Sequence, residues 1–360
     1  MNIFGEKFHS FGLDISDNSL KLISLGKKIG KYEVSSWNKI NLKEGLIKDG
    51  EIINPTEISN QINELIKTSY GPLTSKLVVA NLPESKTFLK VIKLTKEDFE
   101  ESPTVDIIKN ELPKHIPVPI EELNFDWLVI PSDDKSNYFI VIAAAPLKII
   151  RQYTEVLHLA GLNVLALELS YQAAIRTLFF NFKNKNPFIL KKETAKIIID
   201  LGQTSSQLFI FDHGIVKFTN KLDFSSQDIT QKIASELKIN FSEAEKAKIS
   251  FGLNPKKGKG IIKDILDDFI TKLTSDIIKT MEYYKLSFPE GNEIEDLILI
   301  GGGANLLNLK ENLKENLKKN IILGKDALTN LVFKREEKNA SKNLSSLITT
   351  VGLALREWVE

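Results

Sequence analysis

One short pattern, present twice about half a chain length apart, constrains the fold more than any other feature of this sequence. In residues 197–211, IIIDLGQTSSQLFIF, an apolar run ends at Asp200, a polar turn follows, and an alternating apolar run resumes. Residues 11–25, FGLDISDNSLKLISL, repeat the pattern with Asp14 in place of Asp200. Both copies predict strand, tight turn and strand. Because the repeats of a solenoid recur about every 20 to 50 residues, two distant copies instead indicate two related halves.

The turn between the two predicted strands carries groups that suit an anion. Each copy places a carboxylate at the end of a strand and hydroxyl groups, Ser19 and Ser205 among them, beside a row of backbone N–H groups. In the second copy, Gly202 lets the backbone approach a ligand. A single copy is equally consistent with an ordinary β-hairpin, because short glycine-containing hairpins are common. The repetition favours a binding site.

The composition excludes several classes of function. Lys and Arg number 48 and Asp and Glu 47, so the net charge of +1 gives no field that favours nucleic acid or an acidic membrane surface. The absence of cysteine excludes disulfides, thiol catalysis and thiolate zinc sites, and it agrees with a cytoplasmic protein. We expect no targeting segment, and the longest apolar run, residues 138–147, is about half the length of a membrane-spanning helix.

Predicted strands and helices alternate along the chain, which indicates an α/β protein. A length of 360 residues allows two or more subdomains. Pro55 opens an amphipathic helix, and residues 84–145 indicate a small α+β insert with strands at 87–94, 125–130 and 138–145. The polar residues 183–193 indicate a link between halves. Other strands are expected at residues 32–40, 76–80, 162–167, 214–222 and 296–300. Other helices are expected at residues 147–160, 170–182, 227–237, 242–249, 304–318 and 344–358, and a long helix is expected after residues 254–260 that ends at about residue 286.

A triple glycine, Gly301, Gly302 and Gly303, follows the apolar run LILI at a predicted strand-to-helix junction. Glycines there let the chain pass close to a ligand, and the helix start adds partial positive charge. Taken alone, the turn is equally consistent with close packing of helix on strand. Neither a complete G-x-G-x-x-G nor a G-x-x-x-x-G-K-[ST] pattern is present, so dinucleotide-binding and P-loop folds are disfavoured.

Other candidate sites lack supporting residues. The lysine-rich residues 254–260 have no interleaved aromatic residues, so a solvated loop is favoured over a nucleic-acid patch. No G-x-S-x-G elbow is present. Four histidines are isolated in the sequence and have no metal-ligand spacing: His9, His115, His158 and His213.

The order hairpin, hairpin, strand-GGG-helix resembles the phosphate-1, phosphate-2 and adenosine motifs of the actin, Hsp70 and sugar-kinase superfamily. This resemblance implies a clamp for ATP. The two hairpins would grip the β- and γ-phosphates from opposite domains, Asp14 and Asp200 would hold Mg²⁺ through water, and the glycine turn would support the nucleoside.

Longer segments are similar to one family within this superfamily, the PilM family of type IV pilus assembly proteins. They include GLIKDGEIIN, ANLPESKTFLKVIKL, LPKHIPVPIEELNFDWLVI, AGLNVLALELSYQAAIRTL, FSEAEKAK, LILIGGGANL and TVGLALR. The stretch at residues 116–126 is the most specific, because general actin-like ATPases have no reason to share it. The similarity extends over nearly the whole chain.

The resemblance implies an actin-like, duplicated (ribonuclease H-like) α/β fold of two lobes, with a 1C subdomain placed as in the cell-division protein FtsA. The implied subdomains are 1A at residues 1–83 with 160–193 and 335–360, 1C at 84–159, 2A at 194–222 with 290–334, and 2B at 223–289.

The function that the resemblance implies is that of a cytoplasmic ATP-binding component of the pilus inner-membrane alignment complex. It would bind the N-terminal cytoplasmic peptide of PilN near residues 82–87 and 148–153, reach the inner membrane only through partners, and have at most a slow ATPase activity. Other pilus proteins and a second copy of the chain remain open as partners. The alternatives are an FtsA-like membrane-associated filament scaffold and a small-molecule kinase of the same superfamily.

The resemblance also assigns residues to the site. Lys21 would face the phosphates, Glu245 and Lys248 would contact ribose and adenine, and Glu168 lies near the place of the water-activating acid. Equally, Glu245 and Lys248 could form a solvated helix face, and Glu168 could be a strand-end charge. The implied cofactor-binding set is Asp14, Ser19, Lys21, Gly202, Gln203, Thr204, Ser205, Glu245, Lys248, Gly301, Gly302 and Gly303.

One departure from the family pattern lies in the first hairpin. The family has Asp-Ile-Gly-Ser, whereas this chain has Asp14, Ile15, Ser16 and Asp17. Ser16 removes a glycine where backbone N–H groups approach phosphate, and Asp17 adds negative charge. This departure gives the hypothesis that nucleotide binding is weak or that hydrolysis is absent.

Overall fold

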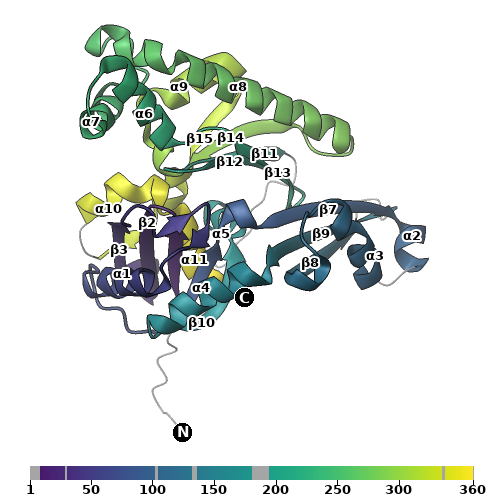
Figure 1. The fold of residues 1–360 in the computed structure, drawn as a ribbon. Coiled ribbons are helices and arrows are strands. Elements are labelled where there is room, and N and C mark those ends of the chain that lie inside the picture. The colour runs from purple at the N-terminus through teal and green to yellow at the C-terminus, as the bar shows by residue number, and fades with distance from the viewer. Residues whose placement is uncertain are drawn as a thin grey trace. The chain divides into compact units, whose positions relative to one another are not determined.

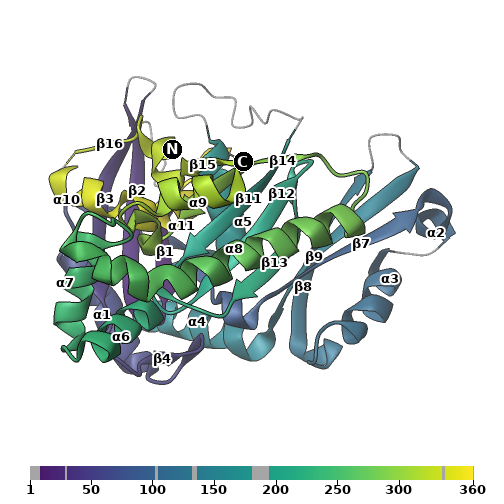
Figure 2. The same ribbon diagram turned by 90° about the horizontal axis from the view of Figure 1, so that it is seen from above.

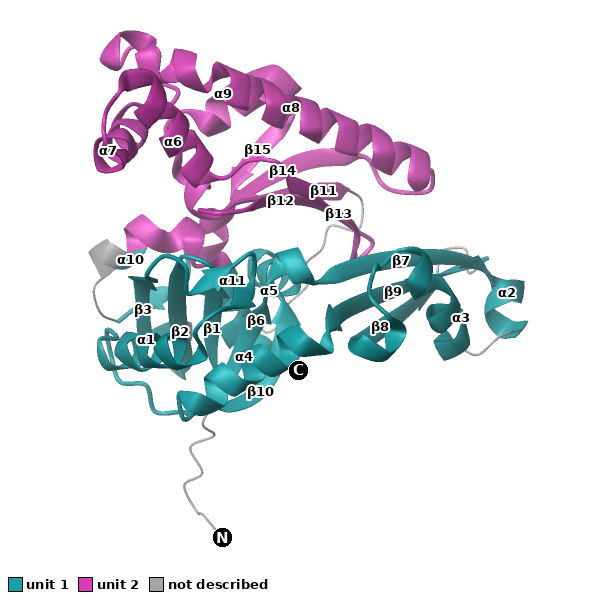
Figure 3. Cartoon of the chain, in the orientation of Figure 1, with its two compact units in different colours: residues 1–188, 330–340, 349–360 teal, residues 189–329, 341–348 magenta. Residues whose placement is uncertain are grey.

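The computed structural model describes residues 9–28, 31–101, 104–131, 136–180, 194–334 and 337–359. The chain divides into two compact units, which are coloured separately in Figure 3. Unit 1 is Met1–Phe188, Asn330–Ala340 and Thr349–Glu360, and unit 2 is Ile189–Thr329 and Ser341–Ile348. The predicted link at residues 183–193 lies outside the described residues. Among the helices of the described ranges, none has both the length and the apolar composition needed to cross a bilayer.

The described part of unit 1 is built around a six-stranded sheet (Figure 1). Its order is β10 (Asn163–Leu169), β6 (Leu77–Leu82), β1 (Phe11–Ser16), β2 (Ser19–Lys28), β3 (Lys31–Asn41) and β16 (Val332–Phe333). β1 pairs antiparallel with β2 and parallel with β6, and β2 pairs antiparallel with β3. The predicted first hairpin is therefore confirmed, and it lies at the centre of the sheet.

Helices cover both faces of this sheet. α1 (Pro55–Lys67), capped by the Asn54 side chain, and α4 (Leu147–Leu159) pack with Leu13 of β1 in one apolar core. α5 (Ser170–Phe179) and α11 (Ile348–Ala354) lie on the other face, where Gly12 of β1 leaves no room for a side chain beside the Thr350 backbone. Because successive side chains of a strand alternate between faces, Asp14 shares the Gly12 face, on which α11 lies.

A second, three-stranded sheet in unit 1 has the order β7 (Phe88–Thr95), β9 (Asn137–Pro146) and β8 (Leu123–Pro131). It packs on α3 (Thr104–Glu111) around buried residues such as Ile108 and Ile140, and α2 (Lys96–Glu101) follows β7 (Figure 1). The three strands predicted within residues 84–145 are thus confirmed. The division of the chain into four subdomains stays a prediction.

The sheet of unit 2 repeats the topology of the first. Among its described residues, the order is β13 (Ile215–Leu222), β12 (Ser206–Asp212), β11 (Ala195–Leu201), β14 (Ile294–Ile300) and β15 (Asn320–Leu323). β11 pairs antiparallel with β12 and parallel with β14, as β1 does with β2 and β6. The register is also the same, because Asp14 lies opposite Lys21 and Asp200 opposite Gln207. The predicted duplication is therefore present down to single cross-strand pairs.

Helices complete the core of unit 2. α8 (Ile261–Ser287) runs along one face of the sheet (Figure 2), where Leu266 and Leu273 pack with Ile197 and Leu299. α6 (Ser226–Leu237), α7 (Phe241–Phe251) and α9 (Leu309–Leu317) pack with it. The short elements elsewhere are β4 (Ile47–Lys48), β5 (Glu51–Ile52), η1 (Glu84–Lys86), η2 (Leu112–Lys114), η3 (Ile120–Glu122), η4 (Gly258–Gly260), η5 (Gly302–Asn305), η6 (Gly324–Leu328), α10 (Glu337–Asn343), η7 (Leu344–Ser346) and α12 (Arg356–Val359).

Three predicted helix boundaries are wrong. The capping box of α7 is formed by Asn240 and Glu243, and the predicted pair Ser242 and Glu245 lies inside the helix. The helix predicted at residues 304–318 begins only at Leu309, because Asn308 has a φ of 63°, and this left-handed conformation cannot be part of a right-handed helix. The helix predicted at 344–358 is split into η7, α11 and α12.

Candidate functional site

The first hairpin places Asp14 and Lys21 directly opposite each other on β1 and β2. The Lys21 Nζ lies 2.7 Å from the Asp14 Oδ2, and both side chains are largely buried. Thr350 of α11 lies 3.5 Å from the same carboxylate oxygen. A buried ion pair with a nearby hydroxyl holds the Asp14 carboxylate in one orientation, which favours binding of a metal ion directly or through water.

Ser16 and Asp17, which differ from the family pattern in the first turn, both form local hydrogen bonds. The Ser16 hydroxyl donates to the Ser19 carbonyl at 3.0 Å, and the Asp17 carboxylate accepts from the Gly50 N–H at 3.1 Å. Ser16 also keeps a negative φ, so the backbone there does not require glycine. Asp17 is therefore engaged with the turn between β4 and β5, which weakens the argument that its charge repels a phosphate.

Asn81 of β6 holds the turn end of β1 through side-chain hydrogen bonds to Ile15, and it belongs to none of the predicted motifs. Its side chain accepts from the Ile15 N–H at 2.8 Å and donates to the Ile15 carbonyl at 3.3 Å and to Ser170 at 3.1 Å. Asn81 is buried at the end of the apolar run LVVANL. A polar residue within an apolar strand could have indicated this role from the sequence, because polar side chains in a protein core are nearly always hydrogen-bonded.

In unit 2, the glycine turn is packed onto the second hairpin. Gly301 has a φ of 80°, and a Cβ there would overlap the Asp200 carboxylate and come within 2.6 Å of the Leu201 carbonyl oxygen. A Cβ at Gly303 would come within 2.8 Å of the Leu201 side chain. Gly302 differs, because a Cβ there would have no atom of the described residues within 4 Å. Gly301 and Gly303 are thus needed for packing, whereas Gly302 faces open space.

The second turn is held by the start of α6. The N–H of Ser226 donates to the Gly202 carbonyl at 3.0 Å, and the N–H of Gln227 donates to the Gln203 carbonyl at 2.9 Å. A Cβ at Gly202 would overlap the Ser205 carbonyl oxygen, so glycine is required by the tight turn itself. The predicted cofactor-binding residues Gln203, Thr204 and Ser205 are exposed.

Lys248 and Glu245 form a polar network between α7 and α6. The Lys248 Nζ donates to the Ser226 hydroxyl and to Thr230, each at 2.7 Å, and pairs with Glu245 at 2.8 Å. Lys248 is only 6% exposed, so it does not belong to a solvated helix face. It fixes the first turn of α6, which in turn holds the turn at Gly202. Whether it also contacts ribose or adenine stays a prediction.

Glu168 is the penultimate residue of β10 and is paired with two arginines. Arg176 of α5 donates to it at 2.9 Å, and Arg356 of α12 pairs with it at 3.1 Å. Arg176 also donates to the Gly352 carbonyl at 2.7 Å. With both carboxylate oxygens occupied by guanidinium groups and the side chain 1% exposed, Glu168 is placed to join the sheet to the C-terminal helices. This environment favours a structural role over activation of water.

The structure therefore gathers the predicted residues into two sets, one in each unit. Unit 1 holds Asp14, Lys21 and Ser19, and Glu168 lies two strands from Asp14 in the same sheet, on β10 and opposite Asn81 of β6. Unit 2 holds Asp200, the exposed turn and the glycine turn, next to the Lys248 network. Carboxylate oxygens are ligands that Mg²⁺ prefers, so Asp14 and Asp200 suit the predicted metal. Within the described ranges, no three acidic or histidine residues form a direct metal cluster.

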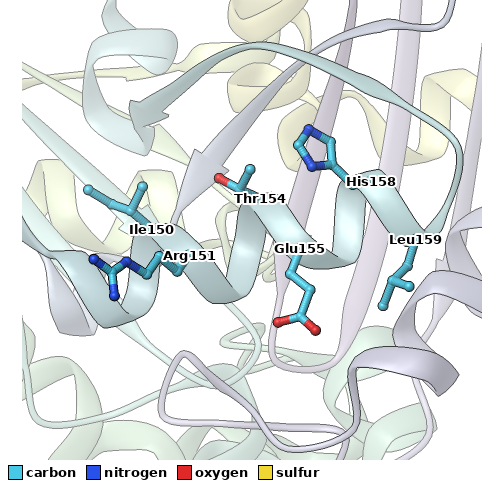
Figure 4. A pocket seen from close by; sticks show the side chains of 6 residues that line it. All are labelled: Ile150, Arg151, Thr154, Glu155, His158 and Leu159. Carbon is cyan, nitrogen blue, oxygen red and sulfur yellow. The ribbon is translucent and has the colours of Figure 1, made fainter.

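A separate hollow of about 580 Å³ lies on the outer face of α4 in unit 1. Figure 4 shows its side chains along one side of the helix, with the charged Arg151 and Glu155 among them. It overlaps the peptide groove predicted at residues 148–153. Its lining residues are Ile150, Arg151, Thr154, Glu155, His158 and Leu159.

Comparison with known proteins agrees with the predicted family. The family model described as type IV pilus assembly protein PilM matches residues 12–358. Among solved structures, one titled PilM-PilN type IV pilus biogenesis complex superposes with a TM-score of 0.81 at 21% identity, covering 98% of this chain and 99% of that chain.

Two further solved structures show the same fold at lower similarity. The ethanolamine utilization protein EutJ from Carboxydothermus hydrogenoformans gives a TM-score of 0.57 at 14% identity, with 96% of this chain and 89% of that chain covered. MreB5 of Spiroplasma citri, bound to AMPPNP, gives 0.54 at 12% identity, with 98% and 97% covered. Together these similarities confirm the predicted actin-like α/β fold.

Proposed function

The chain belongs to the PilM family of type IV pilus assembly proteins, and we propose that it acts there as an ATP-binding adaptor that docks the cytoplasmic tail of a PilN-type membrane protein. Its place would be the cytoplasmic side of the inner membrane, reached through that partner. The observation that carries the nucleotide part of the proposal is the glycine turn. Gly301 and Gly303 pack against the second hairpin, while the intervening Gly302 is exposed to open space.

The geometry of Gly302 suits a ligand that must come close to the backbone. The protein itself would tolerate a side chain at this position, since a Cβ would meet no described atom. A flat nucleoside resting on the turn would not tolerate it, because glycine allows the closest approach of the main chain. The exposed hydroxyl turn at Thr204 and Ser205 lies on the hairpin that Gly301 packs against, and it offers groups for the phosphates.

Bound Mg²⁺ would neutralise phosphate charge, with Asp14 and Asp200 holding it through water. Asp14 is paired with Lys21, and the Asp200 carboxylate lies against the backbone of Gly301. Glu168 is paired with Arg176 and Arg356, so its carboxylate is poorly placed to act as the base for hydrolysis. We therefore propose that hydrolysis, if catalysed, is slow and that nucleotide acts mainly by stabilising one conformation.

The docking part of the proposal rests on a connected frame around the turn between β4 and β5. The Ser85 hydroxyl donates to the Asp49 carbonyl at 2.9 Å, and the buried Tyr153 donates to the Gly50 carbonyl at 3.2 Å. Lys148 of α4 pairs with Glu51 at 2.9 Å. The two segments predicted to border the peptide groove, residues 82–87 and 148–153, are thus joined through one turn, and the hollow on α4 adjoins them.

Two titrations test the proposal. For nucleotide, Gly302→Val should leave the unfolding midpoint unchanged and weaken Mg-ATP binding at least tenfold, with Gly26→Val, a sterically tolerated change in β2, as the control. Equal ATP affinity in Gly302→Val and wild type would contradict the nucleotide site.

For the partner, a synthetic peptide of the PilN-type N-terminal tail is titrated into the chain. Ile150→Ser in the α4 hollow should weaken binding about tenfold, and Ile278→Ser, a change of the same kind at an exposed position of α8, should not. No binding of the peptide at high micromolar concentration would contradict the docking function.

A further inference from the structure

Three residues form a row across the first three strands of unit 1. Asp14 of β1 lies opposite Lys21 of β2, and Lys21 lies opposite Lys39 of β3. Directly opposite residues in an antiparallel sheet point to the same face with their Cβ atoms about 5 Å apart. The row therefore brings two ammonium groups to a single carboxylate, on the face of the sheet where Thr350 of α11 contacts Asp14.

The charges in this row do not balance. Lys21 takes the Asp14 carboxylate at 2.7 Å, whereas Lys39, which is half-buried, forms no direct ion pair and no side-chain hydrogen bond with the described residues. Burial, followed by the like charge of Lys21, holds the pKa of Lys39 below the ordinary lysine value, and the more distant Asp14 only partly offsets this. A partly desolvated cation without a direct counter-ion is costly unless an anion completes its environment.

The duplicated hairpin of unit 2 provides an internal comparison. The equivalent row there is Asp200, Gln207 and Lys221, and Lys221 is exposed. One carboxylate in unit 2 therefore faces one cation that water can solvate, whereas unit 1 has two cations, neither of them fully solvated. The excess positive charge is particular to the first hairpin.

We propose that Lys39 is an anion-binding residue of the first hairpin and that its ligand is the polyphosphate of the bound nucleotide. This inference rests on the proposed nucleotide binding and adds a residue to it that no sequence motif marks. Lys21 neutralises Asp14 and keeps it in place, which leaves Lys39 as the cation available to phosphate oxygens. Lysine suits this role because its ammonium binds phosphate as a point charge without a fixed orientation.

Calorimetric titration with ATP, ADP and adenosine in magnesium buffer tests the inference. Lys39→Gln should weaken ATP binding about tenfold or more, ADP binding less, and adenosine binding not at all, because only the phosphates carry the charge that Lys39 would meet. Lys39→Arg should retain most of the ATP affinity. The matched control is Lys43→Gln, which removes the same charge from an exposed lysine that pairs with Glu57.

The unfolding midpoint without nucleotide separates binding from a structural role. Lys39→Gln should leave it unchanged or raise it, because the change removes an uncompensated cation. Equal ATP affinity for Lys39→Gln and wild type, or an equal loss for ATP and adenosine, would overturn the inference while the proposed function stands. If the wild-type chain binds none of the three ligands, the proposed function fails and the inference fails with it.

Discussion

Gly301 lies against Asp200 so closely that a methyl group on its Cα would overlap the Asp200 carboxylate. The turn that follows β14 and the acidic end of β11 are therefore one packed unit, in which neither position can change alone. This contact joins two features that are a hundred residues apart in the sequence, and it explains why glycine is needed at Gly301 for the fold as well as for the proposed ligand.

Gly301→Ala should destabilise unit 2. The φ of 80° costs an alanine roughly 1–2 kcal/mol, and the overlap with Asp200 and Leu201 adds to this cost, so we expect a total of about 3 kcal/mol. Gly302→Ala should change the free energy of unfolding by less than about 0.5 kcal/mol, because its Cβ would meet no described atom. Urea unfolding of both variants measures the difference. Equal stabilities would contradict the packing described here.

Glu168→Gln should lower stability, because the change leaves Arg176 and Arg356 without their shared carboxylate. Breaking a buried pair by removing one partner costs about 3–5 kcal/mol, and the partial exposure of Arg356 places the expectation near the lower end. Chemical unfolding at neutral pH checks this, with Glu155→Gln on the exposed side of α4 as the control. A stable Glu168→Gln variant that had lost ATP hydrolysis would restore the catalytic assignment and contradict the structural one.

Asp212 should make unit 2 sensitive to acid. It is buried at the end of β12, and burial disfavours its charged form, but hydrogen bonds from Tyr284, Asn292 and His213 outweigh burial and hold its pKa below the ordinary aspartate value. A carboxylate whose pKa is lower in the folded than in the unfolded state stabilises the folded state. This stabilisation is complete at pH values above the pKa of the unfolded state, which is near 4, and it is lost as the pH falls through the lower pKa of the folded state.

The comparison of Asp212→Asn with wild type tests this pH dependence. At pH 7 the variant should be about 2 kcal/mol less stable, since its amide cannot replace the charge-assisted hydrogen bonds. The difference should shrink as the pH falls from 4 to 2.5, measured by urea unfolding at each pH. A difference that stays constant over this range would contradict the role assigned to the ionised carboxylate.

Tyr153→Phe should loosen the turn between β4 and β5. The Tyr153 hydroxyl is buried and donates to the Gly50 carbonyl, so its removal leaves that carbonyl unsatisfied and should cost about 1 kcal/mol. If the peptide groove lies beside this turn, the affinity for the PilN-type tail peptide should fall as well. Tyr70→Phe, at a partly exposed position, is the control for both measurements. Unchanged peptide affinity in Tyr153→Phe would move the groove away from this turn.

The sequence predicted the duplicated hairpins and the α/β order because both depend on local patterns. Asp14 and Asp200 each end an apolar segment, and a polar turn and a second apolar segment follow, so strand, turn and strand are predicted for both copies, and their register is the same in both units. The triple glycine was recognised because no other residue type allows so close an approach. These features need no knowledge of distant contacts.

Features that depend on distant partners were not predictable in the same way. The bracing of Ile15 by Asn81 and the pairing of Glu168 with Arg356 join residues far apart in the chain. The helix start at Leu309 depends on Asn308 taking a left-handed conformation, which asparagine tolerates without requiring. The row from Asp14 to Lys39 became visible only once β3 was paired with β2.

Calorimetric titration of Mg-ATP into the wild-type chain and into Asp200→Ala tests the central claim most directly. We predict one saturable binding event for the wild type and none for Asp200→Ala, with both chains folded as judged by their unfolding transitions. The absence of Mg-ATP binding by the wild-type chain, or undiminished binding by Asp200→Ala, would contradict the proposal that this chain is a nucleotide-binding adaptor.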